Sequence, residues 1–436
     1  MLRLLALCLL LSLVFMTDDA AAGSLKNFVF RDRDAFSWQL ERVAAAADGI
    51  HIAYLQVYSG SWQRTEWNHR LRVIIPPDSR WTGVLLYVTG SGSGDSDLQL
   101  MGQIAAKSNC IVAILHDVPN QPLFGGLRED ALIAHSFMRF FETRDSHWPA
   151  LFPMTRSVVA AMDTLEELAR EQSAEQLVGD PTDLKRFVIS GASKRGWTTW
   201  LTAAVDDRVV GIIPAVYDNL NLPAQMKHQL TAWGEFSEQI RDYTELDIPQ
   251  MLDSTEGLEL AELVDPYAYR SSIAVPKLLL IGTNDRYWPV DAAKLYYDEL
   301  VGPTYVHYVP NAGHSLNENE LLQSTIASFA KANLNREQTA AWVDITWSFD
   351  SEGSHRTLTV NTSEEGTIRF WQATSSSRDF REAQWQSVSL HQNAALASHT
   401  YEDREALYQA VFAEVLVDDA NLTYAVAVPV QVIPPR

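Results

Sequence analysis

The sequence contains very little cysteine. Its two cysteines among 436 residues are Cys8 and Cys110, and Cys8 lies in an apolar N-terminal stretch. If that stretch is cleaved off, the cysteine that is left cannot form an internal disulfide. We expect Cys110, which borders an apolar run, to be a small buried side chain rather than a nucleophile. The fold must therefore depend on its apolar core, for which 47% of apolar residues is sufficient.

Positive charge is also scarce. The chain has 34 Lys and Arg residues against 55 Asp and Glu residues, which gives a formal net charge of −21. Nucleic acids and anionic membrane surfaces are bound by basic protein faces, so we expect neither as a partner. The sequence leaves the substrate open as a small molecule or a peptide, and it leaves the oligomeric state open.

Metal-binding and phosphate-binding patterns are missing as well. No cluster of His, Cys, Asp and Glu has the spacing of a metal site, and His116, His228 and His307 stand apart from one another. The glycine-rich segment at residues 90–94 is not followed by the Lys-Ser/Thr pair of a phosphate-binding loop. We therefore expect neither a metal nor a cofactor.

Residues 1–22 have the features of an export signal. Arg3 is followed by an uncharged apolar run, and Ala20-Ala21-Ala22 fits a cleavage site before Gly23. The run is shorter than the roughly 20 residues of a membrane span, and no other stretch is long and apolar enough to cross a bilayer. We predict an exported protein, periplasmic or secreted, without an integral span once the signal is removed. An uncleaved anchor is the alternative.

Apolar runs typical of buried strands alternate with segments of helical periodicity. Strands are expected at residues 51–57, 62–75, 83–89, 110–115, 187–190, 209–215, 276–283 and 304–309. Helices are expected at residues 25–47, 98–107, 128–144, 153–170, 197–205, 291–300 and 318–333. This alternation is typical of an α/β fold, a mostly parallel sheet with helices on both faces. Catalytic groups in such folds collect at the carboxyl ends of the strands.

The pattern of apolar and polar residues changes at two places in the sequence. Residues 216–272 lack strand character and carry several aromatic side chains, so we expect a helical lid, with ordinary core packing as the alternative. After residue 335 the chain consists of short runs, several with period-two alternation, separated by turns. We therefore predict an α/β domain over residues 23–335 and a C-terminal β-sandwich over residues 336–436.

Ser193 is the candidate nucleophile. The apolar run at residues 187–190 ends in Gly191-Ala192-Ser193, and a segment with helical potential follows. This pattern indicates a strand, a sharp turn and a helix, with the serine oxygen lifted to the apex of the turn. The usual elbow has a small residue two places after the serine, whereas here Arg195 holds that place and Gly196 comes one later. The alternative is a strand-to-helix turn with an incidental serine.

Asp285 and His314 are the candidate partners of the serine. Each follows a predicted buried strand, and the order Ser, Asp, His is that of serine hydrolases with a nucleophile elbow. His314 would accept the serine proton, and Asp285 would hold the imidazole. Taken singly, Asp285 could be a turn-capping residue and His314 a loop histidine bonded to backbone. Asp265, before Pro266, is the reserve acid.

The oxyanion donors are expected from two places. The backbone N–H of Lys194 is the first, and the loop that contains Ser91 and Gly92 is the second. The side chains of Lys194 and Arg195 would add positive charge near an anionic substrate, unless they pair with nearby acidic residues. Arg195 and Tyr217, from the start of the aromatic insertion, are the candidate substrate contacts.

Seven sequence blocks together resemble one family. They are Asp117-Val118-Pro119-Asn120-Gln121-Pro122-Leu123, Glu129-Asp130-Ala131-Leu132-Ile133-Ala134, Pro153-Met154-Thr155, Gly191-Ala192-Ser193-Lys194-Arg195-Gly196-Trp197, Asp265-Pro266-Tyr267, Arg369-Phe370-Trp371-Gln372-Ala373 and Arg378-Asp379-Phe380-Arg381. The family is the PhoPQ-activated pathogenicity-related proteins of bacteria, and the amoebal autocrine proliferation repressor is similar too. The resemblance implies an α/β-hydrolase fold, export, an immunoglobulin- or fibronectin-like tail, and virulence-linked or secreted signalling roles. It also implies an elbow glycine three places after the serine.

These observations predict an exported serine hydrolase that cleaves an ester or amide bond, either an esterase or a peptidase. Two alternatives stay open. One is a non-catalytic secreted binding or signalling protein on a hydrolase scaffold, since fold does not guarantee function. The other is a carbohydrate esterase, because the elbow alone is also similar to that of glucuronoyl esterases, where the basic residue helps the oxyanion.

Overall fold

The computed structural model describes residues 23–31, 35–77, 79, 82–171, 184–317, 319–335, 342–419 and 422–436. The predicted signal peptide, residues 1–22, lies outside the described residues. Among those that are described, none of the helices combines the length and the apolar character that a bilayer crossing requires.

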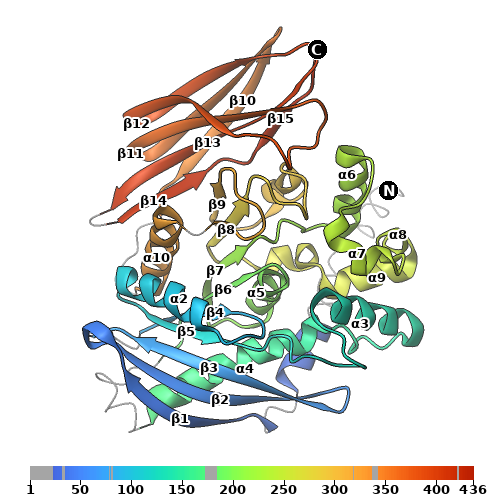
Figure 1. Ribbon diagram of the computed structural model, residues 1–436, viewed down its shortest axis with the longest axis vertical. Helices are drawn as coiled ribbons and strands as arrows, with labels where there is room; N and C mark the ends of the chain where they lie inside the picture. The colour runs from blue at the N-terminus through green and yellow to red at the C-terminus, as the bar shows by residue number, and fades with distance from the viewer. Residues whose placement is uncertain are drawn as a thin grey trace, which may run out of the picture.

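The first nine strands of the described chain form the α/β part of one continuous, twisted 15-stranded sheet (Figure 1). The strands are β1 (Ser37–Ala45), β2 (His51–Trp62), β3 (Thr65–Ile75), β4 (Val84–Val88), β5 (Ile111–Leu115), β6 (Phe187–Ala192), β7 (Val209–Ala215), β8 (Lys277–Gly282) and β9 (Thr304–Val309). Their spatial order is β1-β2-β3-β5-β4-β6-β7-β8-β9. The pairs from β1 to β5 are antiparallel, and all pairs from β5 to β9 are parallel.

Helices cover both faces of the parallel part. The helices are α2 (Asp95–Ser108), α3 (Glu129–Thr143), α4 (Leu151–Arg170), α5 (Lys194–Val205) and α10 (Glu320–Leu334). Alternate side chains of one strand enter two separate cores, because successive residues of a strand face opposite sides. In β4, Val84 and Leu86 pack in the core that contains α3, α4 and α5, whereas Leu85 packs in the core that contains α2 and α10. This arrangement confirms the α/β fold predicted from the sequence.

A helical insertion separates β7 from β8. It consists of α6 (Leu222–Trp233), η4 (Glu238–Ile240), α7 (Arg241–Thr244), α8 (Ile248–Met251), α9 (Thr255–Val264) and η5 (Pro266–Ser272). In Figure 1 these yellow-green helices lie to one side of the strands, next to α3. The insertion occupies the segment predicted as a lid. It begins at the carboxyl end of β7, the same edge of the sheet at which the neighbouring strand β6 leads into Ser193.

The last strands form an additional antiparallel sheet region. They are β10 (Ile345–Glu352), β11 (His355–Ser375), β12 (Gln386–Glu402), β13 (Tyr408–Asp419), β14 (Leu422–Ala427) and β15 (Gln431–Ile433). This region adjoins the central sheet, since Ala427 of β14 pairs with Val306 of β9. The predicted all-β segment is therefore present, and its strands continue the sheet of the α/β part. The division into two domains at residue 335 stays a prediction.

One predicted helix is wrong over most of its length, and a second is wrong throughout. The first was expected over residues 25–47, but helical structure covers residues 23–30, and residues 37–45 form β1, which pairs with β2. The second was expected over residues 291–300, where the chain makes two short 3-10 turns, η6 (Ala292–Leu295) and η7 (Tyr297–Glu299), separated by Tyr296 in a non-helical conformation. In both places tertiary packing overrides local helical propensity.

Candidate active site

Ser193 occupies a strained turn between β6 and α5. Its φ of 57° and ψ of −124° lie outside the usual regions for a residue with a side chain. The backbone N–H of Ser193 donates to Ala215 O at 2.8 Å, which ties the turn to the end of β7. Such an outlier between a buried strand and a helix is the geometry of a nucleophile elbow.

Two glycines make this turn possible. A Cβ on Gly191 would lie 2.7 Å from the carbonyl oxygen of Arg195, so the backbone itself fills that space. A Cβ on Gly196 would lie 3.0 Å from Cβ of Tyr217 and 3.1 Å from Gly191 O. The close approach that requires a small residue therefore falls at Gly196, three places after the serine. Arg195 is tolerated in between because its side chain leaves the turn.

Asp285 and His314 are joined by a hydrogen bond. Nδ1 of His314 lies 2.8 Å from Oδ2 of Asp285, and the Asp285 side chain is almost fully buried. The other oxygen of Asp285 accepts the backbone N–H of Tyr287 at 2.8 Å, so both carboxylate oxygens are held. The Tyr287 ring stacks on the imidazole with centroids 4.0 Å apart. These contacts fix the ring plane and leave Nε2 as the free nitrogen of His314.

Nε2 of His314 is buried and has no hydrogen-bond partner among the residues that the structure describes. Ser193 therefore does not hold this atom by a hydrogen bond here. The two residues are linked through Tyr287, which stacks on His314 and lines the same pocket as Ser193. Catalytic hydrogen bonds of enzymes without substrate are often long and tighten when substrate binds. A triad of Ser193, His314 and Asp285 stays a prediction.

Asp265, the reserve acid, serves a different purpose. Its carboxylate accepts the backbone N–H groups of Leu222 at 2.6 Å, Tyr267 at 2.9 Å and Asn221 at 3.2 Å. It therefore caps the start of α6 and of η5. Burial raises the pKa of Asp265 to about 6, even though these amides act in the opposite direction. No hydrogen bond or ion pair joins Asp265 to His314 in the described part of the chain, so Asp285 is the acid that the geometry favours.

The glycine loop after β4 is anchored from behind by arginines of β3. Arg70 donates to Gly92 O at 2.7 Å, and Arg72 donates to Ser93 O at 2.7 Å. The backbone amides of Ser91 and Gly92 donate to no residue in the described part of the chain. Because β4 and β6 are parallel neighbours, this loop and the Ser193 turn emerge side by side. The loop thus offers free amides on the rim where an oxyanion would form.

Lys194 and Arg195 are both paired with carboxylates. Arg195 makes a two-pronged contact with Glu129, at 2.7 and 2.8 Å, and donates to Val118 O at 2.6 Å. Nζ of Lys194 lies 3.0 Å from Glu129 and 3.3 Å from Asp130. Burial alone would raise the pKa of Glu129, but Arg195 and Lys194 hold it at about 2. The two cations are therefore neutralised, which is the alternative that the sequence left open.

Arg195 also packs against the glycine loop after β4. A Cβ on Gly90 would lie 2.5 Å from the Arg195 guanidinium, so the loop packs directly on this side chain. The guanidinium is in turn held by Glu129 at the start of α3. Arg195 does not line the pocket beside Ser193, and its place is between the elbow and the loop. Its predicted contact with substrate stays a prediction.

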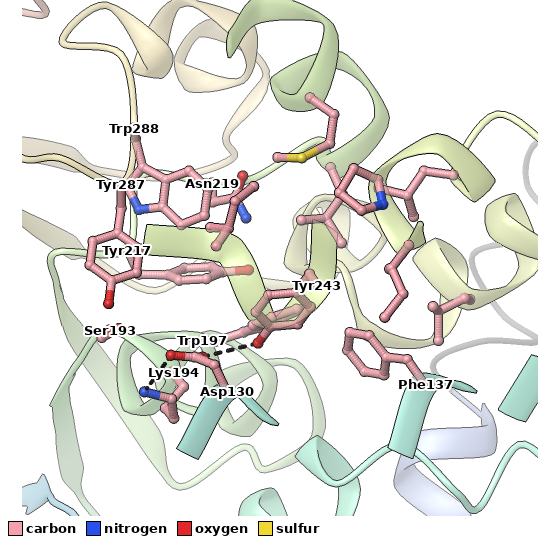
Figure 2. A pocket seen from close by; sticks show the side chains of 17 residues that line it. Asp130, Phe137, Ser193, Lys194, Trp197, Tyr217, Asn219, Tyr243, Tyr287 and Trp288 are labelled. Carbon is pink, nitrogen blue, oxygen red and sulfur yellow. Dashed lines mark hydrogen bonds and ion pairs between the residues drawn. The ribbon is translucent and has the colours of Figure 1, made fainter. Parts of the chain in front are cut away.

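A largely apolar pocket extends from Ser193 into the insertion (Figure 2). The aromatic side chains that line it are Phe137, Trp197, Tyr217, Tyr243, Tyr287 and Trp288. Tyr217, a predicted substrate contact, stacks on Trp197 with centroids 5.2 Å apart. Figure 2 shows Tyr217 and Tyr287 beside Ser193, and Phe137 at the far end of the pocket. Residues of the helical insertion, such as Met226, form the remaining wall.

The comparisons with known proteins place the chain in a family. Residues 25–381 match the profile of the PhoPQ-activated pathogenicity-related protein family. The chain belongs to this family. It is also 30% identical over 404 residues to autocrine proliferation repressor protein A of Dictyostelium discoideum. The alignment covers 86% of this chain and 79% of that protein. The family resemblance predicted from the sequence blocks is thereby confirmed.

A solved structure with a similar fold is that of an esterase. An acetyl xylan esterase from Paenibacillus sp. R4 matches with a TM-score of 0.51 at 14% identity, over 72% of this chain and 94% of that one. At this identity the likeness concerns the fold alone. The α/β-hydrolase fold of this PhoPQ-related chain is thus established by its own strand order together with this neighbour.

Several residues that shape this family member's site escaped the sequence analysis. Glu129 pairs with both cations of the elbow, Tyr287 stacks on His314, and Arg70 anchors the glycine loop. Only Glu129 had a signal, since it lies in a block that resembles the family. Cys110 was expected to be buried but is only half-buried, and burial raises the pKa of its thiol. Within the described ranges, no group of three or more potential metal ligands occurs.

Proposed function

We propose that this PhoPQ-related protein is an exported serine hydrolase that cleaves esters through Ser193, His314 and Asp285. The observation that carries the proposal is the 2.8 Å hydrogen bond between His314 and Asp285, at the strand ends next to the strained Ser193 turn. Export is supported by the signal-like composition of residues 1–22. Peptidase activity on an amide bond is the neighbouring possibility within the same mechanism.

The chemistry follows from the roles of the three side chains. Oγ of Ser193 attacks the substrate carbonyl carbon, and its proton passes to Nε2 of His314. The proton then goes to the leaving alcohol as the ester C–O bond breaks, which leaves an acyl group on Ser193. Water, deprotonated by His314, hydrolyses this acyl-enzyme and restores the serine. Asp285 stabilises the imidazolium that exists between these transfers.

The developing oxyanion would be met by backbone amides. Lys194 opens α5, and the first amides of a helix have no intrahelical acceptor. The amides of Ser91 and Gly92 supply the second donor from the anchored loop. One such donor typically contributes a factor of about 10² to 10³ to kcat. This explains why the Lys194 side chain can be committed to Glu129 and Asp130, because only its N–H is needed.

The pocket favours an ester with an apolar group on one side of the scissile bond. Its wall is built from aromatic and aliphatic side chains, whose burial against an apolar substrate group is favourable by about 25 cal/mol per Å². The charged residues at its mouth, Lys194 and Asp130, already neutralise each other. A carboxylate or phosphate on the substrate would therefore find no free cation there.

Filling the pocket should change substrate choice. Met226 lies in the pocket wall on α6, and Met226→Trp should lower kcat/KM for esters with a branched or aromatic acyl group by about 10- to 100-fold. Acetate esters should be affected less than about threefold. The measurement is a series of p-nitrophenyl esters of increasing acyl size. Leu230→Trp, at an exposed position of the same helix, is the matched control, and equal losses for all acyl sizes would contradict the assignment.

A non-catalytic signalling role is the second candidate. It is favoured by the name of the Dictyostelium relative, an autocrine proliferation repressor, and by the absence of a hydrogen bond to His314 Nε2 among the described residues. Ester turnover separates the two functions, because a pure binding protein would show no hydrolysis that depends on Ser193.

The proposed nucleophile is tested by covalent labelling. A fluorophosphonate probe should label the mature wild-type chain, and the adduct should map to the peptide that contains Ser193. Ser193→Ala should abolish labelling, whereas Ser190→Ala, three residues earlier on buried β6, should be labelled as the wild type is. Equal labelling of Ser193→Ala and the wild type would sink the proposal.

A further inference from the structure

The loop between β11 and β12, residues 376–385, lies against the segment that carries Asp285. Nδ2 of Asn284 donates to three backbone carbonyls of this loop, those of Phe380 at 3.3 Å, Arg381 at 3.2 Å and Ala383 at 2.7 Å. Asn284 immediately precedes Asp285 in the chain. The backbone at the base of Asp285 is therefore held by a segment about 100 residues downstream.

The same loop also holds the segment that carries His314. Asn311 exchanges two hydrogen bonds with the backbone of Trp385: Nδ2 donates to Trp385 O at 3.0 Å, and Oδ1 accepts Trp385 N–H at 2.8 Å. This two-way pairing resembles one rung of a β-ladder and fixes the plane of the amide. Asn311 lies three residues before His314.

The two asparagines are coupled to each other through Thr283. Oγ1 of Thr283 donates to Oδ1 of Asn284 at 2.8 Å and accepts the backbone N–H of Asn311 at 2.8 Å. The backbone N–H of Asn284 in turn donates to Ala312 O at 2.9 Å. One hydrogen-bonded network thus connects the β11–β12 loop, the Asp285 segment and the His314 segment.

Charged and aromatic contacts hold the same loop along its length. Arg378 lies 2.7 Å from Asp291, and Glu382 pairs with Arg286. The guanidinium of Arg381 lies over the ring of Trp233 of the insertion, 4.3 Å from its centroid. The side chains of Phe380 and Trp385 are nearly fully buried. The loop is therefore packed in place rather than laid on the surface.

We propose that the β11–β12 loop is a positioning element of the active site, and that Asn284 and Asn311 are the positioning residues through which it acts. The proposal rests on the function proposed above. On this view, the C-terminal strands support catalysis by holding the β11–β12 loop in place. The backbone carbonyl and N–H groups of this loop fix the two segments that carry Asp285 and His314. Neither asparagine touches the substrate.

The physical reason lies in the precision that proton transfer requires. A catalytic group must be held within about 0.5 Å of its productive position, and a displacement of about 1 Å can cost roughly 10²-fold in rate. Asp285 and His314 both lie in loops, which have fewer restraints than strands. The bonds from Asn284 and Asn311 replace the missing restraints. Their removal should misplace the Asp285–His314 pair and leave the substrate pocket intact.

The expected result is a selective fall in kcat. Asn284→Ala and Asn311→Ala should each lower kcat for p-nitrophenyl acetate by about 10- to 100-fold, with KM changed less than about threefold. Asn333→Ala is the matched control, because its side chain also donates to a backbone carbonyl, that of Phe329 at 2.8 Å, but it lies against Gly211 near the other end of β7. It should keep the wild-type kcat.

A proton NMR measurement reports on positioning without turnover. The proton shared by His314 and Asp285 should give a low-field signal in the wild type, and the signal should broaden or vanish in Asn284→Ala but persist in Asn333→Ala. If the wild type has the signal but no Ser193-dependent turnover, the proposed function fails while the loss of signal in Asn284→Ala still supports positioning. A wild-type kcat and an unchanged signal in both asparagine variants would overturn the inference.

If the alanine variants do not fold, Arg378→Gln decides the question. This change removes the ion pair with Asp291 and touches neither Asn284 nor Asn311. A looser loop should lower kcat severalfold at constant KM and broaden the low-field signal. A folded Arg378→Gln protein with wild-type kcat and signal would contradict the positioning role.

Discussion

Replacing His314 by alanine should lower kcat for ester hydrolysis by about 10⁴-fold or more while KM changes little. The imidazole is the group proposed to accept the Ser193 proton, and general-base assistance with nucleophile activation accounts for losses of this size. The residual rate would come from the oxyanion amides and from binding. The measurement is steady-state hydrolysis of p-nitrophenyl acetate by purified mature protein.

Asp285→Asn should have a similarly large effect by a different route. The amide keeps the shape of the side chain but cannot stabilise the imidazolium, and its NH₂ group favours the wrong tautomer of His314. His355→Ala, an exposed histidine at the start of β11, and Asp207→Asn, an exposed aspartate after α5, are the controls. Wild-type kcat in His314→Ala or Asp285→Asn would remove the basis of the proposed triad.

The sequence predicted the central fold well because its signals are local. The run of apolar residues in β4, β5, β6 and β8 exceeds what a half-exposed strand carries, so burial on both faces was readable. The tight turn at Ser193 was predictable for a similar reason, because its two glycines are close in the sequence. In the structure, backbone atoms lie within 3.1 Å of where a Cβ on Gly191 or Gly196 would be. Asp285 and His314 then followed from chain order and from the strands that precede them.

What the sequence did not predict depends on partners distant in the chain. Residues 37–45 have helical propensity, and they become strand β1 only because β2 offers its edge. The residues around Glu129 do not indicate that its carboxylate will pair with Arg195, which lies 66 residues later in the chain. Asn284 and Asn311 look like ordinary turn residues until the β11–β12 loop meets them. Local propensity and residue spacing carry no information about such contacts between residues distant in the chain.

Asp218 is a buried carboxyl group, and its protonation should change the free energy of unfolding with pH. It follows β7 and is 2% exposed, and its Oδ1 accepts the Tyr296 hydroxyl at 2.6 Å. Oδ2 has no hydrogen-bond partner in the described structure. Burial raises the pKa of Asp218 to about 7, and the negative charges of Asp285 and Asp291 add to the effect, although Tyr296 opposes it. A protonated Asp218 avoids placing another negative charge near Asp285.

The sign of the pH dependence follows from this raised pKa. Between about pH 4 and pH 7 the folded chain retains the Asp218 proton that the unfolded chain releases, so this group lowers stability as pH rises and has no further effect above its folded pKa. Asp218→Asn is neutral at every pH and lacks this loss. Each pKa unit corresponds to about 1.4 kcal/mol, so the variant should gain roughly 3 kcal/mol relative to wild type between pH 5 and pH 8.

The measurement is urea unfolding of wild type and Asp218→Asn at both pH values, with Asp207→Asn as the exposed control. Tyr296→Phe offers an internal check, because losing its hydroxyl removes a donor that favours the ionised carboxylate. The Tyr296→Phe protein should therefore lose more stability than wild type as pH rises from 5 to 8. If the difference between Asp218→Asn and wild type stays constant across this range, Asp218 is ionised in the folded protein and must be counted among the negative charges around Asp285.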